Sequence, residues 1–192
     1  MEKINVLRSL QSFVVLPILA TNLLGAPVAF EKFPTVAVLS TDENGLLSPK
    51  LSDNQQNDIE VKAQKIDAYF AKYNLPLAGH GETFVNVAEK YGLPWNFLPS
   101  IAMAESTGCK FIIPKTNNCF GWGSGKIKFQ SIDESIEIIA KNLSGNNPNT
   151  AHHYADKDID GILKTYNPPR IAPKYLGIVK GIMKSIENIN LE

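Results

Sequence analysis

The sequence has no excess of either charge, because its 19 basic and 19 acidic residues cancel. A nucleic-acid-binding protein normally carries a basic excess that neutralises phosphates, so the charge balance argues against that class. Histidine is also scarce, and His80, His152 and His153 have no zinc-type spacing with the cysteines. We therefore expect no nucleic acid as a partner, no metal and no organic cofactor.

Cysteine is nearly absent, with Cys109 and Cys119 as the two examples. In an exported protein, two cysteines separated by a short loop are most simply explained by one disulfide. A closed loop of this modest length would add about 2 to 3 kcal/mol of stability. Two buried thiols are the alternative interpretation.

Long apolar runs are confined to the N-terminus. Lys3 and Arg8 precede an apolar stretch that begins at Leu10 and ends in small residues around Ala26 and Ala29. This pattern predicts a secretory signal peptide over residues 1–29 and a secreted or cell-envelope protein. Because a membrane span needs about 20 predominantly apolar residues, an uncleaved anchor is the second choice. We expect no membrane contact beyond that possible anchor.

Two further regions follow the predicted signal. Residues 30–57 are polar and rich in turn-forming residues, which predicts a flexible linker. Residues 58–192 contain helical periodicity interrupted between Gly108 and Phe129, where a loop or a short hairpin around 126–129 is expected. The fold class is therefore mainly α, with a small hairpin or loop subdomain. We predict helices over residues 58–75, 82–91, 95–105, 132–143, 158–166 and 173–189.

Glu105 interrupts an apolar helix face. Leu98, Ile101, Ala102 and Glu105 stand at i, i+3, i+4 and i+7, so a helix places all four on one side. Burial on such a face favours the protonated carboxyl, which is the form that a general acid requires. The alternative is a glutamate at a helix end that points into solvent.

Three segments resemble the lysozyme-like glycan hydrolases. They are Ala104-Glu105-Ser106-Thr107-Gly108, Asn117-Asn118-Cys119-Phe120-Gly121-Trp122-Gly123 and the stretch 129–136. Their order and spacing are most similar to bacterial peptidoglycan N-acetylglucosaminidases of the glycoside hydrolase family 73 type, with some character of soluble lytic transglycosylases. The resemblance covers about residues 63–189 and implies a lysozyme-like helical domain over residues 58–192 with the loop subdomain beside its active-site cleft.

The resemblance also implies roles for individual residues. Glu105 would be the acid, and Tyr166, on a later helix, would face it. A second group would line the cleft and bind substrate: Ser106, Asn117, Asn118, Phe120, Gly121 and Trp122. Independently of the resemblance, glycines permit close approach of a sugar and flat aromatic rings suit pyranose faces. Taken singly, the aromatic residues are equally explained as core and the asparagines as turn residues.

The sequence therefore predicts a monomeric peptidoglycan hydrolase that cleaves β-1,4 glycosidic bonds in glycan strands. No partner carboxylate can be assigned, because Asp133, Glu134, Asp156, Asp158 and Asp160 are better explained as helix caps or first-turn charges. A lytic transglycosylase that forms 1,6-anhydromuramoyl products is one alternative. A catalytically inactive glycan-binding or scaffolding module is the other.

Overall fold

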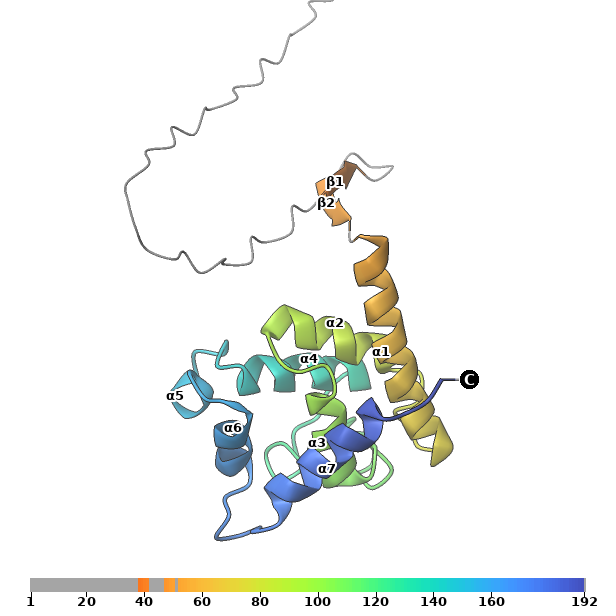
Figure 1. Ribbon diagram of the computed structural model, residues 1–192. Coiled ribbons are helices and arrows are strands. Elements are labelled where there is room, and N and C mark those ends of the chain that lie inside the picture. Colours follow the sequence, from red (N-terminus) through yellow and green to blue (C-terminus); the bar gives the residue numbers. More distant parts are fainter. Residues whose placement is uncertain (1–37, 42–46, 51, 192) are drawn as a thin grey trace, which may run out of the picture. The chain divides into compact units, whose positions relative to one another are not determined.

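The computed structural model describes residues 38–41, 47–50 and 52–191 (Figure 1). Its elements are β1 (Val38–Thr41), β2 (Leu47–Lys50), α1 (Asp53–Lys72), α2 (Gly81–Tyr91), α3 (Phe97–Ser106), α4 (Ile132–Leu143), α5 (Ala151–Tyr154), α6 (Ile159–Tyr166) and α7 (Tyr175–Glu187). The prediction of a mainly helical fold is confirmed. The predicted signal peptide over residues 1–29 lies outside the described residues, as do residues 30–37 of the predicted linker.

The predicted linker contains more regular structure than expected. Strands β1 and β2 pair antiparallel, with Val38 opposite Lys50. Helix α1 then begins at Asp53 because Ser52 caps it: the Ser52 hydroxyl accepts a hydrogen bond from Gln55 N, and the Gln55 side chain accepts one from Ser52 N. The polar residues 53–57 are thus the first turn and a half of a helix, which the search for apolar periodicity could not detect.

A carboxylate fixes the corner between α1 and α2. Asp67 Oδ1 accepts hydrogen bonds from Gly79 N at 2.7 Å and from Gly81 N at 2.8 Å. At Gly81 the two helices are so close that a Cβ atom would lie 2.2 Å from Ala63 O. Any larger residue at this position would push the helices apart.

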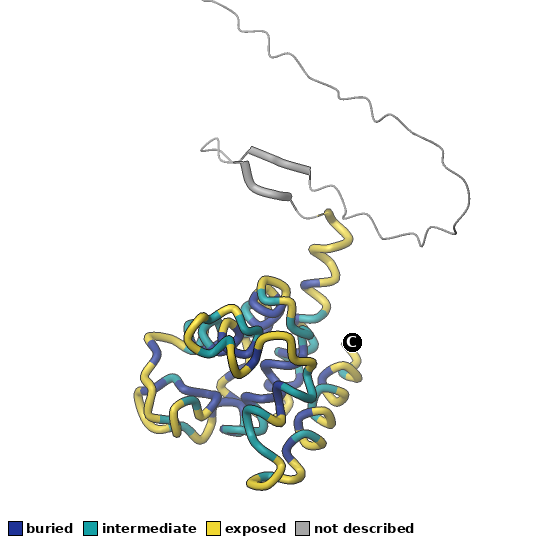
Figure 2. Tube along the Cα trace, turned by 90° about the vertical axis from the view of Figure 1, so that its left-hand side faces the viewer, coloured by how far each residue is buried: buried dark blue, intermediate teal, exposed yellow. Residues whose placement is uncertain are grey.

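Helix α3 contributes the most completely buried face of the domain. Phe97, Leu98, Ile101 and Ala102 are all fully buried, and α3 packs against α2 and α7 (Figures 1 and 2). Apolar residues of α1, α2, α4, α6 and α7 complete one contiguous core. Across the described residues, the helices are all too short or too polar to cross a membrane.

Most predicted helices are present with ends that differ by a few residues. Helix α4 begins after Ser131, whose hydroxyl caps it by accepting a hydrogen bond from Glu134 N at 3.0 Å. The short helix α5 was not predicted. Tyr73 follows the last residue of α1 and is half exposed. Residues 107–131, described throughout, contain no strand, so the expected subdomain is a loop rather than a hairpin.

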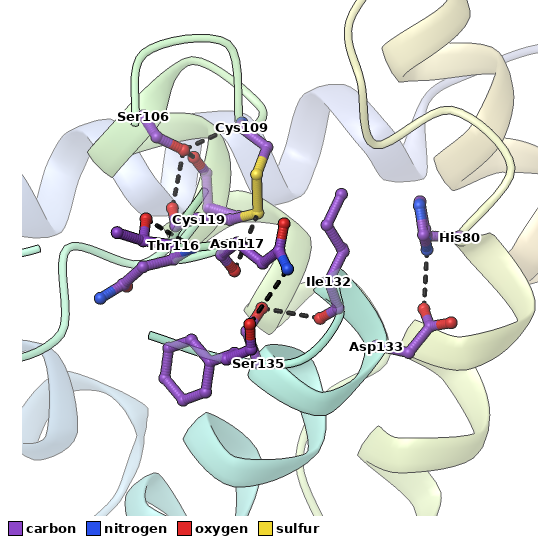
Figure 3. Close-up of a disulfide and its surroundings, with 12 residues drawn as sticks. His80, Ser106, Cys109, Thr116, Asn117, Cys119, Ile132, Asp133 and Ser135 are labelled. Atoms are coloured by element: carbon purple, nitrogen blue, oxygen red, sulfur yellow. Dashed lines mark hydrogen bonds and ion pairs between the residues drawn. A yellow bond between two sulfur atoms is a disulfide. The ribbon is translucent and has the colours of Figure 1, made fainter. Parts of the chain in front are cut away.

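The predicted disulfide is confirmed between Cys109 and Cys119 (Figure 3). Both half-cystines are buried, at 4% and 0% exposure. The bond closes a loop that begins just after α3, in a region where helices no longer supply backbone hydrogen bonds. It therefore restrains the segment that follows Glu105.

Replacing both cysteines, Cys109→Ala with Cys119→Ala, should lower the free energy of unfolding by about 2 to 3 kcal/mol, because the unfolded chain gains loop entropy. Urea denaturation followed by circular dichroism measures this loss. The wild-type protein under reductant should approach the variant, while the variant should not respond to reductant. Equal stability of the oxidised wild type and the variant would contradict the prediction.

Candidate active site

A cleft of about 550 Å³ lies at the C-terminal end of α3. Segments far apart in the sequence meet there: the end of α3, the loop after it, α5 and α6. The lining residues are Glu105, Phe120, Gly121, Trp122, Gly123, Ser124, Tyr154, Tyr166 and Asn167. The structure thus brings together five of the eight residues that the sequence singled out, and leaves Ser106, Asn117 and Asn118 outside the lining.

Glu105 is the acidic residue of this cleft. Its Oε1 atom is buried and has no hydrogen-bond partner, and a Cβ atom at Gly121 would lie 3.1 Å from its Oε2 atom. Burial raises the pKa of the Glu105 carboxyl, and the nearby Tyr175 hydroxyl opposes this rise in part. The carboxyl therefore holds its proton to a higher pH than an exposed glutamate does.

Two stacked tyrosines lie beside this carboxyl. The rings of Tyr166 and Tyr175 are nearly parallel, with centroids 6.2 Å apart. Burial raises the pKa of both hydroxyls, and the charge of Glu105 raises it further. The Tyr166 hydroxyl donates to the carbonyl of Phe120, whereas the Tyr175 hydroxyl is buried without a partner of acceptable geometry. The charge of Glu105 therefore acts on Tyr166, but the Tyr166 hydroxyl donates its hydrogen bond to the loop backbone and not to the carboxyl.

The segment from Cys109 to Gln130, which we call the cleft loop, is organised from within by asparagines. Both amide protons of Asn118 are donated, to Trp122 O at 2.8 Å and to Ile127 O at 3.0 Å, and its Oδ1 accepts from Trp122 N. Asn117 donates to Phe129 O at 3.0 Å. The amide donors of both asparagines are therefore used by loop backbone, and neither residue is part of the cleft lining.

Ser106 and Phe120 are likewise structural. The Ser106 hydroxyl accepts from Cys109 N at 2.9 Å and lies 2.7 Å from Cys119 O, to which it donates (Figure 3). It thereby ties the end of α3 to both half-cystines. The Phe120 ring, predicted to offer a face to a sugar, belongs to a residue that is only 1% exposed. Phe120 contributes its carbonyl to the cleft wall and its ring to the core, which corrects that prediction.

Gly121 and Trp122 lie where a ligand would meet them. Gly121 has φ of 64°, a left-handed conformation that favours glycine, and its missing side chain leaves the Glu105 carboxyl accessible. The half-buried Trp122 ring lies between Tyr154 and Tyr166, with centroids 6.4 and 5.9 Å away. The three rings form the aromatic part of the cleft lining, and Gly121 is the backbone part that leaves room for a ligand.

Glu105 is the one carboxylate among the lining residues that the structure describes. The other acidic residues considered from sequence have different contacts. Asp133 pairs with His80 Nδ1 at 2.7 Å, Glu134 accepts from Gln130 N, Asp158 caps α6 through Gly161 N, and Asp160 pairs with Lys180. Asp156 is exposed, outside the lining. None of these five acidic residues therefore lies in the lining of the cleft.

A larger cleft, of about 680 Å³, lies between α6 and α7 and is lined by residues such as Asn96, Asp160 and Lys180. Two of its charged residues, Lys180 and Asp160, form an ion pair with each other. It contains none of the buried side-chain atoms that lack a partner. The smaller cleft is therefore the better candidate for an active site, because its lining includes Glu105 with an unpartnered buried oxygen.

Sequence reasoning missed Tyr175 and gave Tyr154 no role. Tyr175 is 7% exposed and stands on the inward face of α7 with Val179 and Ile186. Its spacing from these residues is a signal for burial, but no pattern in the sequence shows which distant residue a buried tyrosine meets. Comparison of the sequence with protein-family models and with curated proteins finds no match.

Glu105→Gln should raise the free energy of unfolding at neutral pH by on the order of 1 kcal/mol, a modest value because the cleft side of the carboxyl still meets solvent. The folded-state pKa of Glu105 is raised, so ionisation destabilises the native protein as pH climbs from the ordinary carboxyl range through that raised pKa. Below this window the carboxyl is neutral in both states.

Urea titrations of both proteins from pH 3.5 to 8 measure the difference. We expect it to vanish at the acidic end and to grow with pH, while Glu89→Gln, on the exposed surface of α2, should show no such trend. A difference that is constant across the range would contradict the assignment of a raised pKa.

Proposed function

We propose that this protein cleaves β-1,4 glycosidic bonds in peptidoglycan strands, with Glu105 as the general acid. The observation that carries the proposal is the half-buried carboxyl with an unpartnered oxygen, opening into an aromatic cleft. A titratable group with a raised pKa in such a concavity is where acid catalysis is expected. No other acidic group of the described chain combines these properties.

Each residue of the cleft has its own role in the proposed reaction. A glycosidic bond breaks when positive charge develops at the anomeric carbon and the leaving oxygen receives a proton. Glu105 supplies that proton, and Gly121 leaves room for the sugar beside its Oε2 atom. The half-buried Trp122 ring provides an apolar face against which a pyranose ring packs. Tyr166 holds the Phe120 carbonyl and so keeps this part of the cleft loop in place.

Tyr175 acts as a positioning residue for the acid. Its hydroxyl, next to the carboxyl, lowers the pKa of Glu105 and so stabilises the carboxylate left after proton transfer. That stabilisation moderates the effect of burial. The carboxyl can therefore serve first as an acid and then, once ionised, as a base.

A lytic transglycosylase is the second candidate, favoured by the presence of a single carboxylate in the cleft lining. In this reaction Glu105 protonates the leaving O4 oxygen and the C1–O4 bond breaks. The C6 hydroxyl of the same muramoyl residue then attacks C1, and Glu105 takes its proton. The product is a 1,6-anhydro ring and the acid is regenerated, so neither water nor a second carboxylate is required. Hydrolysis instead uses water, with the substrate acetamido group assisting.

The proposal also covers family, fold and location. The resemblance to family 73 glucosaminidases is carried by the order and spacing of the motifs, and the lysozyme-like detail of the fold is part of the same proposal. A secreted or cell-envelope location agrees with the Cys109–Cys119 disulfide, which forms in oxidising compartments. We further propose that the protein acts as a monomer on its glycan.

Glu105→Gln should reduce the digestion of purified cell walls by at least about 100-fold, because the amide keeps the shape but has no acidic proton. Release of soluble muropeptides measures activity, and mass spectrometry of the new ends assigns the mechanism. Reducing ends support hydrolysis, whereas products lighter by one water support the transglycosylase. Glu89→Gln is the matched control and should retain full activity.

Two outcomes would overturn the proposal. Undiminished digestion by Glu105→Gln would remove Glu105 from the mechanism. Binding of the wild-type protein to walls with no release of either kind of end would favour the inactive glycan-binding module.

Tyr175→Phe should shift the pH profile of digestion. Loss of the hydroxyl removes the contact that lowers the pKa of Glu105, so the carboxyl should stay protonated to higher pH and the alkaline limb should move upward. Tyr73→Phe, at a half-exposed tyrosine outside this cleft lining, is the control. A lower rate with an unmoved limb would show that Tyr175 contributes only packing.

A further inference from the structure

The cleft loop carries a segregated positive charge in a protein with no net charge. Between Glu105 and Asp133 the sequence contains four lysines and no acidic residue. Lys110, Lys115, Lys126 and Lys128 are all exposed, and within the described chain none of them forms an ion pair. The positive excess is therefore confined to one segment of the chain, and it attracts anions from a distance.

The same loop exposes large apolar side chains. Phe111 is 70% exposed, Ile113 47% and Ile127 42%, although isoleucine and phenylalanine are usually buried. Ile113 and Ile127 lie against one turn, since Cβ atoms at Gly125 and Gly123 would meet them at 3.5 and 2.7 Å. An exposed apolar group of this kind marks an interaction surface.

Contacts among its own residues hold the cleft loop in a fixed arrangement. The disulfide, the three hydrogen bonds of Asn118 and the bond from Phe129 N to Thr116 O at 2.8 Å join its parts to one another. The side chains of the four lysines and of the exposed apolar residues take no part in these bonds, and we call the surface that they form the outer side of the loop. Because the loop is already ordered, little conformational entropy is lost when a partner binds.

We propose that the outer side of the cleft loop docks on an anionic phospholipid surface. Lysines beside protruding phenylalanine and isoleucine are the combination that binds membrane interfaces, where ammonium groups meet lipid phosphates and apolar side chains enter the acyl boundary. A purely anionic polymer would account for the lysines but would leave Phe111, Ile113 and Ile127 in water. The lipid surface satisfies both, and it adds a membrane contact that was not expected from the sequence.

Docking would also orient the cleft. Gly121, Trp122, Gly123 and Ser124 line the cleft, and Lys126 and Ile127 follow them directly in the same loop. A loop seated on lipid therefore holds the cleft beside the bilayer surface. If the proposed function is correct, the glycan that is cleaved would be the part of the wall nearest the membrane. The docking itself does not depend on that function.

Sedimentation with vesicles tests the proposal on two proteins, the full chain and the chain without residues 1–37. Phosphatidylglycerol mixed with phosphatidylcholine should bind the protein, and phosphatidylcholine alone should bind it far less. Glutamine at all four loop lysines should weaken binding by roughly 600-fold, at about fivefold for each of the four charges. Glutamine at Lys72, Lys141, Lys164 and Lys184, four exposed lysines elsewhere, should leave binding within about twofold.

The apolar contribution is tested separately. Phe111→Ser with Ile113→Ser should weaken vesicle binding by about tenfold at constant charge. The control is Ile171→Ser with Ile178→Ser, which are equally exposed but outside the loop. Digestion of solubilised glycan strands by each variant is the independent readout of the cleft, and it should be unchanged.

Three results would overturn the docking proposal. The first is equal affinity for neutral and anionic vesicles, and the second is full binding by the loop variants. The third is that the protein binds lipid-free purified walls through the loop lysines and does not bind vesicles. The last would assign the surface to a wall polyanion. Loss of wall digestion in Glu105→Gln has no bearing on vesicle binding, so the two proposals fail independently.

Discussion

The Ser106 hydroxyl, at the junction between α3 and the cleft loop, is the contact on which the site depends. It accepts from Cys109 N and donates to Cys119 O, so one buried side chain joins the end of a core helix to both ends of the disulfide-closed segment. Glu105 is its neighbour in the chain. The position of the carboxyl is thereby coupled to the position of the loop that faces it, and the helix that carries both is among the most deeply buried in the domain. A site built on such an element is more rigid than one carried by loops alone.

The helices were largely predictable because their apolar residues recur with helical period. Leu98, Ile101 and Ala102 are buried as the spacing required, and Glu105 on the same face is half-buried beside them. The beginning of α1 was not predictable from periodicity, since its first residues are polar and only the Ser52 cap marks them. Local signals of hydrophobicity and capping thus carry most of the fold.

The candidate site was less predictable, for reasons of chemistry and distance. Asn118 and Phe120 have the residue types that sugar recognition uses, but amide donors and aromatic rings serve loop backbone and core equally well. Which of these uses a residue has depends on packing, which no short motif encodes. Tyr175 was missed for a different reason: it lies 70 residues after Glu105 in the sequence, and no residue near Glu105 indicates that this tyrosine is its neighbour. Long-range partners are the part of a site that single-sequence patterns leave out.

The walls around the carboxyl come from the cleft loop, α5, α6 and α7, which follow α3 in the chain. The raised pKa of Glu105 is therefore a property of the whole helical domain, because the burial that causes it is supplied by segments far along the chain. Helix α7 contributes twice, since it packs against α3 and also places the Tyr175 hydroxyl near the carboxyl. Removal of this C-terminal helix would take away both the support of the helix that carries Glu105 and the neighbour that moderates its acidity.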